Sequence, residues 1–181
     1  MEKTKNAKMK PGGSRTKGLK YQRHINKILS NWWGEKNSFV SSPGSGAWGK
    51  IVAPADMRVA GDSIVPKEFP FCIEMKKEQS FEFHLMITSP DKHSMTQYLN
   101  KLISEDCMMV NKKPMLIFSK NFWGDYVIIL KKDFDMFNIM CTRFEWYVDR
   151  RVWVIMLLSD FLTHVKKEDI LNIQQSCIRG E

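Results

Sequence analysis

The residues best suited to catalysis lie in one short stretch, where Gly61-Asp62 is followed after eleven residues by Glu74-Met75-Lys76. Side chains alternate along a β-strand, so Glu74 and Lys76 should project from the same face, about two residue rises apart. If the chain returns from Asp62 through an antiparallel hairpin, the Asp62 carboxylate meets both of them. The spacing therefore predicts two carboxylates and one ammonium group around a common point.

Such a group of side chains is suited to the hydrolysis of phosphodiester bonds. The carboxylates of Asp62 and Glu74, with the backbone carbonyl of Met75 as a third ligand, can hold Mg²⁺, and Mn²⁺ can substitute for it. The cation lowers the pKa of a bound water, while the Lys76 ammonium orients that water and stabilises the transition state. An isolated match of this kind also describes a solvent-exposed charge pair on a strand, so the assignment depends on the rest of the sequence.

The first carboxylate has an alternative in Asp56, which follows Pro54 and Ala55. We prefer Asp62 because a Gly-Asp pair followed by a short hairpin gives the tighter return to Glu74.

The hydrophobic pattern predicts the elements that position these residues. Ile25, Ile28, Leu29 and Trp32 recur at helical spacing, which indicates a basic amphipathic helix over residues 17–33. The segment 41–46 contains a proline and two glycines and reads as a loop. The runs at 57–60, 64–65 and 69–75 predict a twisted hairpin sheet. Further strands are expected at 114–119, 126–130 and 152–158, and further helices at 96–109 and 167–177.

The net charge of +8 is concentrated at one end of the chain. Residues 1–23 hold eight Lys and Arg against one acidic residue, which leaves the remaining chain close to neutral. We expect residues 1–16 to form a flexible basic arm drawn to a polyanion such as DNA, with a solubilising tail as the alternative.

Length and composition exclude several classes of protein. A chain of 181 residues with 43% hydrophobic content can bury the core of one domain, here residues 17–181. No apolar run is long enough to span a membrane, and the lysine-rich start lacks the apolar core of a signal peptide, so we expect a cytoplasmic protein. The four cysteines lie far apart without a zinc-ligand spacing and are expected to be reduced.

The order of these motifs resembles the PD-(D/E)XK nuclease superfamily, in particular the archaeal and phage-type Holliday-junction resolvases. In those proteins a basic helix, a Ser-Gly-Ala loop, a Gly-Asp strand and an E-x-K strand follow one another. The four pieces here are the helix entered through Lys17-Gly18-Leu19-Lys20, Ser45-Gly46-Ala47-Trp48, Arg58-Val59-Ala60-Gly61-Asp62 and Phe69 to Lys77. The resemblance covers roughly residues 15–130, and the segment from Val154 to Leu162 is similar as well.

The resemblance implies an α/β fold, a restriction-endonuclease-like αβββαβ core in which helices flank a mixed central sheet, with a C-terminal β-α extension. It implies a Mg²⁺-dependent DNA endonuclease that acts in DNA recombination on branched DNA. A homodimer is expected, because a four-way junction needs two symmetrical cuts. If the chain is phage-encoded, the host cytoplasm is its expected location.

One position departs from the family's pattern. These nucleases usually carry a metal-binding Glu in the first helix, and the nearest residue here is Gln22, whose amide oxygen can coordinate but brings no charge. Glu35, just after the helix, is a possible replacement. Gln97 could orient a water molecule at the site or lie on a surface helix.

Other residues could contact DNA. Phosphate contacts are expected from hydroxyl and ammonium groups along the basic helix, the glycine-rich loop and the E-x-K strand. These candidates are Lys17, Lys20, Arg23, Ser45, Lys50 and Lys77. The six tryptophans could stack on bases, although most are expected in the core or at a dimer interface.

Three functions remain open on the sequence alone. The first is a structure-selective resolvase, and the second is a nuclease of the same fold that cuts flaps, duplex or single-stranded DNA. The third is a DNA-binding protein with a weakened active site, which the amide at Gln22 makes a real alternative.

Overall fold

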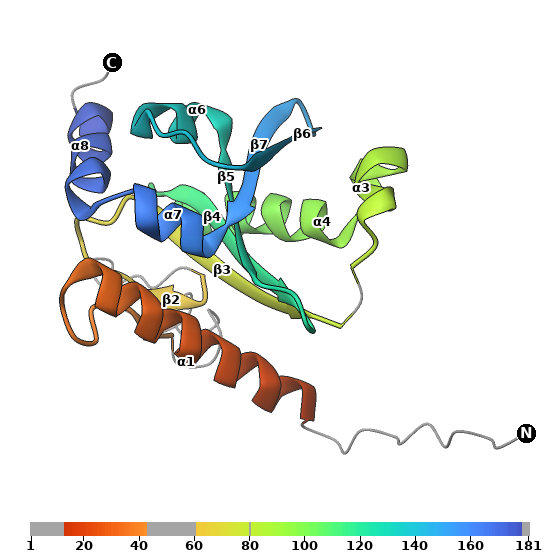
Figure 1. Cartoon of the computed structure of the whole chain (residues 1–181), viewed down its shortest axis with the longest axis horizontal. Helices are drawn as coiled ribbons and strands as arrows, with labels where there is room; N and C mark the ends of the chain where they lie inside the picture. The colour runs from red at the N-terminus through yellow and green to blue at the C-terminus, as the bar shows by residue number, and fades with distance from the viewer. Residues whose placement is uncertain (1–12, 43–60, 80, 179–181) are drawn as a thin grey trace, which may run out of the picture.

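A computed structural model describes residues 13–42, 61–79 and 81–178 of the chain. At its centre is a five-stranded sheet with the strand order β3-β4-β5-β7-β6 (Figure 1). Its strands are β3 (Phe71–Glu78), β4 (Lys113–Lys120), β5 (Asp125–Leu130), β6 (Arg143–Val148) and β7 (Arg151–Leu157).

The sheet is mixed because one pair of strands is parallel and the others are antiparallel. β3 and β4 run parallel, with Glu74 opposite Leu116 and Lys76 opposite Phe118. The pairs β4–β5, β5–β7 and β6–β7 are antiparallel. A parallel pair needs a long crossover, and the chain between β3 and β4 supplies it with helical turns. β3 is thus an edge strand, and one of its sides is open to residues outside the sheet.

One face of the sheet is covered by helix α1 (Gly13–Trp33), together with α7 (Leu158–His164) and α8 (Lys167–Ile178) (Figure 1). The helix α1 buries Tyr21, Ile25, Leu29 and Trp33, one residue every helical turn, against the alternate side chains of the strands. The strand side chains on this face include Phe71, Ile73, Met75, Met115 and Ile117.

The opposite face packs against α3 (Phe83–Thr88) and a longer helical segment (Figure 1). That segment consists of α4 (Ser94–Lys101), a π-helix η3 (Leu102–Cys107) and α5 (Met108–Val110). Its core joins Met86, Met95 and Leu99 to Leu116 and Phe118 of β4, with Trp146 and Trp153 beside them. Smaller helical turns are η2 (Pro90–Lys92), α6 (Lys131–Phe134) and η4 (Asp135–Phe137).

The architecture confirms the predicted fold class, an α/β protein in which helices flank a mixed sheet. The helices predicted at 17–33, 96–109 and 167–177 are present, and α1 begins at Gly13, four residues earlier than predicted. The strands predicted at 114–119, 126–130 and 152–158 are β4, β5 and β7. No helix in the described part of the chain is both long and apolar enough to cross a membrane.

The expected hairpin sheet over residues 57–75 is wrong in its pairing. The short strand β2 (Ser63–Ile64) pairs antiparallel with β1 (Val40–Ser41) and not with β3. Among the described residues, one backbone hydrogen bond, from Asp62 to Ile73, takes the place of a ladder between this segment and β3, where the chain turns sharply at Gly61. The run at 57–60 lies outside the described residues.

Candidate active site

Asp62 lies against the open edge of β3. Its backbone N–H donates to the carbonyl of Ile73 at 2.8 Å, and its carboxylate accepts from the N–H of Met75 at 2.8 Å. The residue before it must be glycine, since Gly61 has a φ of +74° and a Cβ there would lie 2.4 Å from the Ile73 oxygen. The Gly-Asp pair thus brings the carboxylate onto the strand that carries Glu74 and Lys76.

Polar side chains from α1 and the neighbouring segment hold this arrangement. The Ser63 hydroxyl donates to the side-chain oxygen of Asn26 at 2.7 Å, and the Asn26 amide donates to Ser41 at 3.1 Å. The Ser42 hydroxyl donates to the carbonyl of Gly61 at 3.1 Å. Asn26, Ser42 and Ser63 are all buried, so these bonds are shielded from water and fix the backbone on both sides of Asp62.

Glu74 and Lys76 project together from β3 toward the α4 side of the sheet. The Lys76 ammonium donates to the Glu74 carboxylate and lies 5.0 Å from the centre of the Tyr98 ring. The Tyr98 hydroxyl donates to Glu78 at 2.8 Å, which orients its ring beneath the lysine. The alternation expected along this strand is therefore present, with Ile73 and Met75 on the opposite face.

Burial dominates the electrostatics of the two carboxylates. Burial raises the pKa of Asp62, although the Met75 N–H and the nearby Lys76 charge oppose it. Burial also raises the pKa of Glu74, and the charge of Asp62 raises it further. Burial alone would lower the pKa of Lys76, but Glu74 and Asp62 hold it above its ordinary value. Lys76 is therefore a cation at neutral pH, and two closely spaced carboxylates face it.

A third carboxylate lies near this pair. Asp106 is buried in the π-helix η3, and its charge raises the pKa of both Asp62 and Glu74. Single π turns inside α-helices are frequent at functional sites. The sequence did hold a signal for Asp106, because it falls seven residues after Leu99 on the apolar face of its helix.

The donors at the β3 edge fit a hard divalent cation. The Gln22 side chain is buried and hydrogen-bonds the Asp62 carboxylate, while its Oε1 has no hydrogen-bond partner among the described residues. Because the N–H of Met75 points to Asp62, its carbonyl points to the same open edge of β3. In the described part of the chain no three acidic, histidine or cysteine side chains form a ready metal site. Amide and carbonyl oxygens, such as those of Gln22 and Met75, are also ligands for hard cations.

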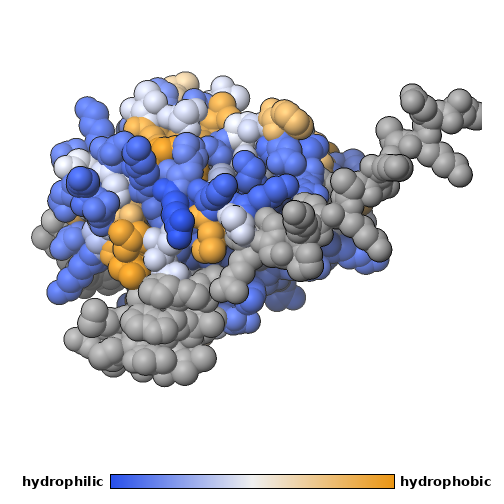
Figure 2. Space-filling view, turned by 90° about the horizontal axis from the view of Figure 1, so that it is seen from below, coloured by the Kyte–Doolittle hydropathy of each residue, from blue (hydrophilic) through white to orange (hydrophobic). Residues whose placement is uncertain are grey.

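Other candidate residues lie in different places. Lys17, Lys20 and Arg23 are exposed along α1, and Lys77 lies 5.2 Å from the ring centre of Tyr21 on that helix. Seen from the side on which α1 lies, the described surface is largely hydrophilic, with hydrophobic residues in separate patches (Figure 2).

Two of the accessory candidates are not at this edge. Glu35 is exposed and forms an ion pair of 2.8 Å with Lys167 of α8. It follows the C-terminal end of α1 at Trp33, whereas Gln22 lies in the middle of that helix. Gln97 is exposed on α4, and its neighbour Tyr98, which the sequence pattern did not indicate, contacts Lys76 instead. Ser45, Lys50 and Asp56 lie outside the described residues.

Comparison with known families gives one match over most of the chain. The sequence model of the family described as "Phage putative PDDEXK endonuclease" matches residues 13–172. Comparison with curated proteins and with solved structures gives no match.

Proposed function

The chain belongs to the phage PD-(D/E)XK endonuclease family, and on that basis we propose that it hydrolyses DNA at Asp62, Glu74 and Lys76 with a divalent cation. The observation that carries this proposal is the meeting of the Asp62 carboxylate with the Glu74–Lys76 pair at the open edge of β3. Buried carboxylates with raised pKa values, beside a lysine that stays protonated, are common at catalytic sites.

Each side chain has a distinct proposed role. Asp62, Glu74, the Met75 carbonyl and the Gln22 amide oxygen would hold the cation, with Mg²⁺ favoured and Mn²⁺ as a substitute. The bound cation supplies an activated water and offsets the negative charge of the phosphate. Lys76 would donate hydrogen bonds to the attacking water and to the phosphate oxygens, where negative charge develops. Tyr98 keeps the Lys76 ammonium in position.

Gln22 sets this chain apart from relatives with a glutamate in the first helix. An amide oxygen supports coordination but leaves the site one negative charge short, so we expect weaker binding of the cation. Asp106 adds negative charge nearby and would partly offset that loss. Gln22 keeps a DNA-binding protein with a weakened site as the alternative, and Asp106 favours an active nuclease over it.

DNA would lie across α1 and the β3 edge. Exposed Lys17, Lys20 and Arg23 line the helix next to Lys77, so phosphates on either side of the cut could contact them. Ser45 and Lys50 are proposed as further contacts. We also propose that residues 1–16 act as a basic arm and that residues 17–181 form the nuclease domain.

The proposed substrate is branched DNA, in particular the four-way junction, cut by a homodimer in the cytoplasm of the host. The resemblance to junction resolvases and the need for two symmetrical cuts support this choice. Flaps, duplex and single-stranded DNA are the alternatives.

The test is a cleavage assay on labelled four-way junction, flap, duplex and single-stranded DNA, each with Mg²⁺, Mn²⁺ or EDTA. The proposal expects paired symmetrical cuts in the junction, dependent on a divalent cation. Equal cleavage of all four substrates would rule out the junction preference, and equal cleavage in EDTA would rule out the role of the cation.

A further inference from the structure

The turn between β4 and β5 carries an aromatic side chain in an unfavourable position. The N–H of Trp123 donates to the carbonyl of Lys120 at 3.0 Å, which closes a four-residue turn. Phe122, the third residue of this turn, has a φ of +68°, where glycine or asparagine is usual. Its side chain is 106% exposed, so no packing in the described structure offsets that strain. A bulky residue that is strained and unpacked points to a contact outside the chain.

Next to this turn is a groove of about 510 Å³ with aromatic walls. Phe81, Phe118 and Tyr126 form a continuous stack in its floor, with ring centres 5.3 Å and 5.2 Å apart. The Trp123 ring stands 5.9 Å from Phe81 and is 45% exposed. On the other side, Phe83 contacts Phe144 of β6 with ring centres 5.4 Å apart, and both are exposed. Phe118 is buried in the middle of this stack, so the rings that the groove offers to a flat ligand are the exposed ones of Trp123, Phe83 and Phe144.

The groove begins beside the proposed active site, on the same face of the sheet. One row of paired residues crosses the sheet from the proposed active site into the groove. From β3 to β4, β5 and β7 it consists of Lys76, Phe118, Tyr126 and Leu157. Phe118, Tyr126 and Leu157 all line the groove. Neighbouring strands are about 4.8 Å apart, so the groove floor begins one strand away from the proposed catalytic lysine.

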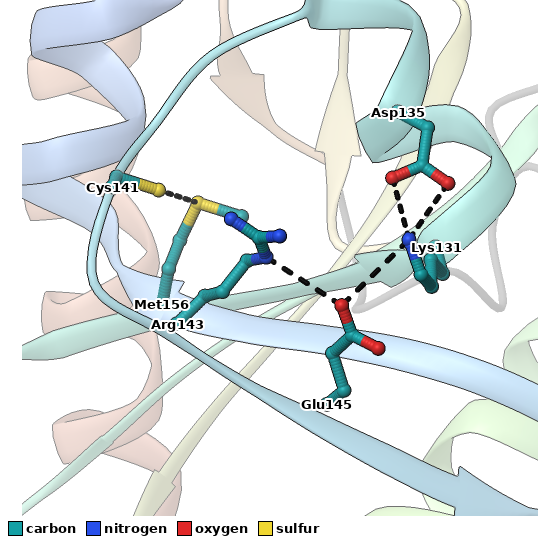
Figure 3. Close-up of polar contacts among 6 residues, drawn as sticks. All are labelled: Lys131, Asp135, Cys141, Arg143, Glu145 and Met156. Atoms are coloured by element: carbon teal, nitrogen blue, oxygen red, sulfur yellow. Dashed lines mark hydrogen bonds and ion pairs between the residues drawn. The ribbon is translucent and has the colours of Figure 1, made fainter.

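Positive charge is available at the end of the groove near the turn. The Lys120 ammonium lies 4.6 Å from the Trp123 ring centre. In the sheet, Lys120 is opposite Glu78, which is two residues after Lys76 on β3. Arg143, at the opposite end, is engaged elsewhere: its guanidinium points to Glu145, which also pairs with Lys131 (Figure 3). An anionic ligand would therefore enter from the Lys120 end, next to Phe122.

We propose that this groove and Phe122 bind an unpaired nucleobase of the DNA strand that enters the active site. Aromatic rings bind bases of any sequence by stacking, and a nearby lysine binds the adjoining phosphate. Phe122 would insert beside the last base pair and keep the unpaired base on the Trp123 side. This inference rests on the proposed nuclease function, and it makes unpaired DNA next to the cut the feature that the enzyme recognises.

The test separates stability from binding. Phe122→Gly should raise the Tm by a few degrees, because glycine accepts a positive φ without strain. It should also weaken binding of a flap or junction with an unpaired base by roughly 5- to 150-fold, the range for loss of one stacked base. Binding of a fully paired duplex should be unchanged. Trp123→Ala should have the same effect on DNA binding.

The binding experiments use the Glu74→Gln background, so that they do not depend on cleavage. The probe is 2-aminopurine at the unpaired position, whose fluorescence falls when it stacks on an aromatic ring. Tyr147→Ala is the matched control, since Tyr147 is 67% exposed on β6 and does not line the groove. Wild-type quenching and affinity are expected for this control.

Unchanged quenching and affinity in both Phe122→Gly and Trp123→Ala would overturn the proposal. A dimer that becomes monomeric in these variants without any change in quenching would overturn it too, and would assign the groove to a second copy of the chain. Affinity and quenching are measured without cleavage, so they test base binding in the groove even if the protein proves not to be a nuclease.

Discussion

Asp62 and Glu74 occupy a position where negative charge is unfavourable without a cation. Asp62 is 4% exposed, and burial raises the pKa of both carboxylates above the ordinary values of 3.8 and 4.5. Lys76 supplies one positive charge against these two groups and the nearby Asp106. A divalent cation would restore the balance, which explains in physical terms why the site should bind one.

The first prediction follows from this imbalance. A carboxyl group whose pKa is raised by folding binds more protons in the folded state than in the unfolded one. The stability of the metal-free protein should therefore fall as the pH rises from about 4 through the raised pKa. Asp62→Asn should remove this loss of stability, so the metal-free variant should be more stable than wild type at neutral pH. The expected gain in free energy of unfolding is about 1.4 kcal/mol for each unit by which folding raises the pKa of Asp62.

Thermal or urea unfolding at several pH values, with and without Mg²⁺, measures this effect. Wild type should gain stability on addition of Mg²⁺, and Asp62→Asn should not. Asp56→Asn is the control and should behave as wild type if Asp62 is the metal ligand. Equal responses to Mg²⁺ in wild type and Asp62→Asn would remove Asp62 from the site, and a lost response in Asp56→Asn would assign the role to Asp56.

At the scale of single residues, the sequence allowed Asp62, Glu74 and Lys76 to be chosen as candidates, and the structure brings these three together. Their spacing was informative because side chains on one strand have fixed directions. Tyr98 and Asp106 were not predicted, because their proximity depends on how the helical segment after β3 packs on the sheet. The residue of α4 that contacts the site is Tyr98 and not the predicted Gln97. The spacing of apolar residues does not fix the rotation of a helix about its axis closely enough to distinguish two adjacent residues.

At the scale of elements, the site depends on how closely the segment around Gly61 approaches β3. The backbone hydrogen bond from Asp62 to Ile73 leaves no space for a side chain at Gly61. Strand β3 can accept this contact because β4 occupies only its other side.

We predict that Gly61→Ala loses most of the cleavage activity, because the added Cβ would push the Asp62 carboxylate away from Met75 and Glu74. A displacement of about 1 Å at a catalytic group can cost roughly 100-fold in rate. The free energy of unfolding should also fall, by about 1–2 kcal/mol or more, from the positive φ alone.

Gly18→Ala is the matched control for that substitution. Gly18 lies within α1, and an added Cβ there would meet nothing within 4 Å. Alanine should stabilise the helix by about 0.5–1 kcal/mol without loss of cleavage. Steady-state kinetics and unfolding curves of the two variants give the comparison, and similar activities would show that the approach of Gly61 to β3 is not essential.

Secondary structure was predictable where the apolar pattern was strong. Helix α1 and strands β4, β5 and β7 were expected within a few residues of their bounds. Strand β6 was missed because its burial is uneven, with Phe144 and Tyr147 exposed beside buried Trp146. The pairing of β2 with β1 was missed because it depends on side-chain bonds from Asn26, which local propensity does not reveal.

At the scale of the whole molecule, charge and catalysis are separated along the chain. Nearly all of the net charge of +8 lies in residues 1–23, whereas the proposed active site begins at Asp62. Exposed Lys20 and Arg23 of α1 lead from the basic segment toward Lys77 at the β3 edge. Binding and cleavage should therefore respond differently to changes in the first residues.

We predict that deletion of residues 1–12, which carry four lysines and one glutamate, weakens DNA binding and flattens its salt dependence. Each phosphate that is no longer neutralised should change the slope of log K against log salt by about 0.9. Adding Lys20→Ala and Arg23→Ala should extend the effect, while cleavage at saturating protein is retained. Fluorescence anisotropy at several salt concentrations measures the slope. An unchanged slope in the combined variant would show that DNA is bound elsewhere.

The most direct test of the central claim is the single-turnover cleavage rate of Glu74→Gln and Lys76→Ala with Mg²⁺, measured on whichever labelled DNA the wild type cuts best. Glu35→Gln is the control, since Glu35 is an exposed carboxylate paired with Lys167. We expect both site variants to be slower by at least about 100-fold. We also expect DNA affinity within a few-fold of wild type and normal cleavage by Glu35→Gln. Near-wild-type cleavage by both Glu74→Gln and Lys76→Ala would contradict the assignment of the active site to the edge of β3.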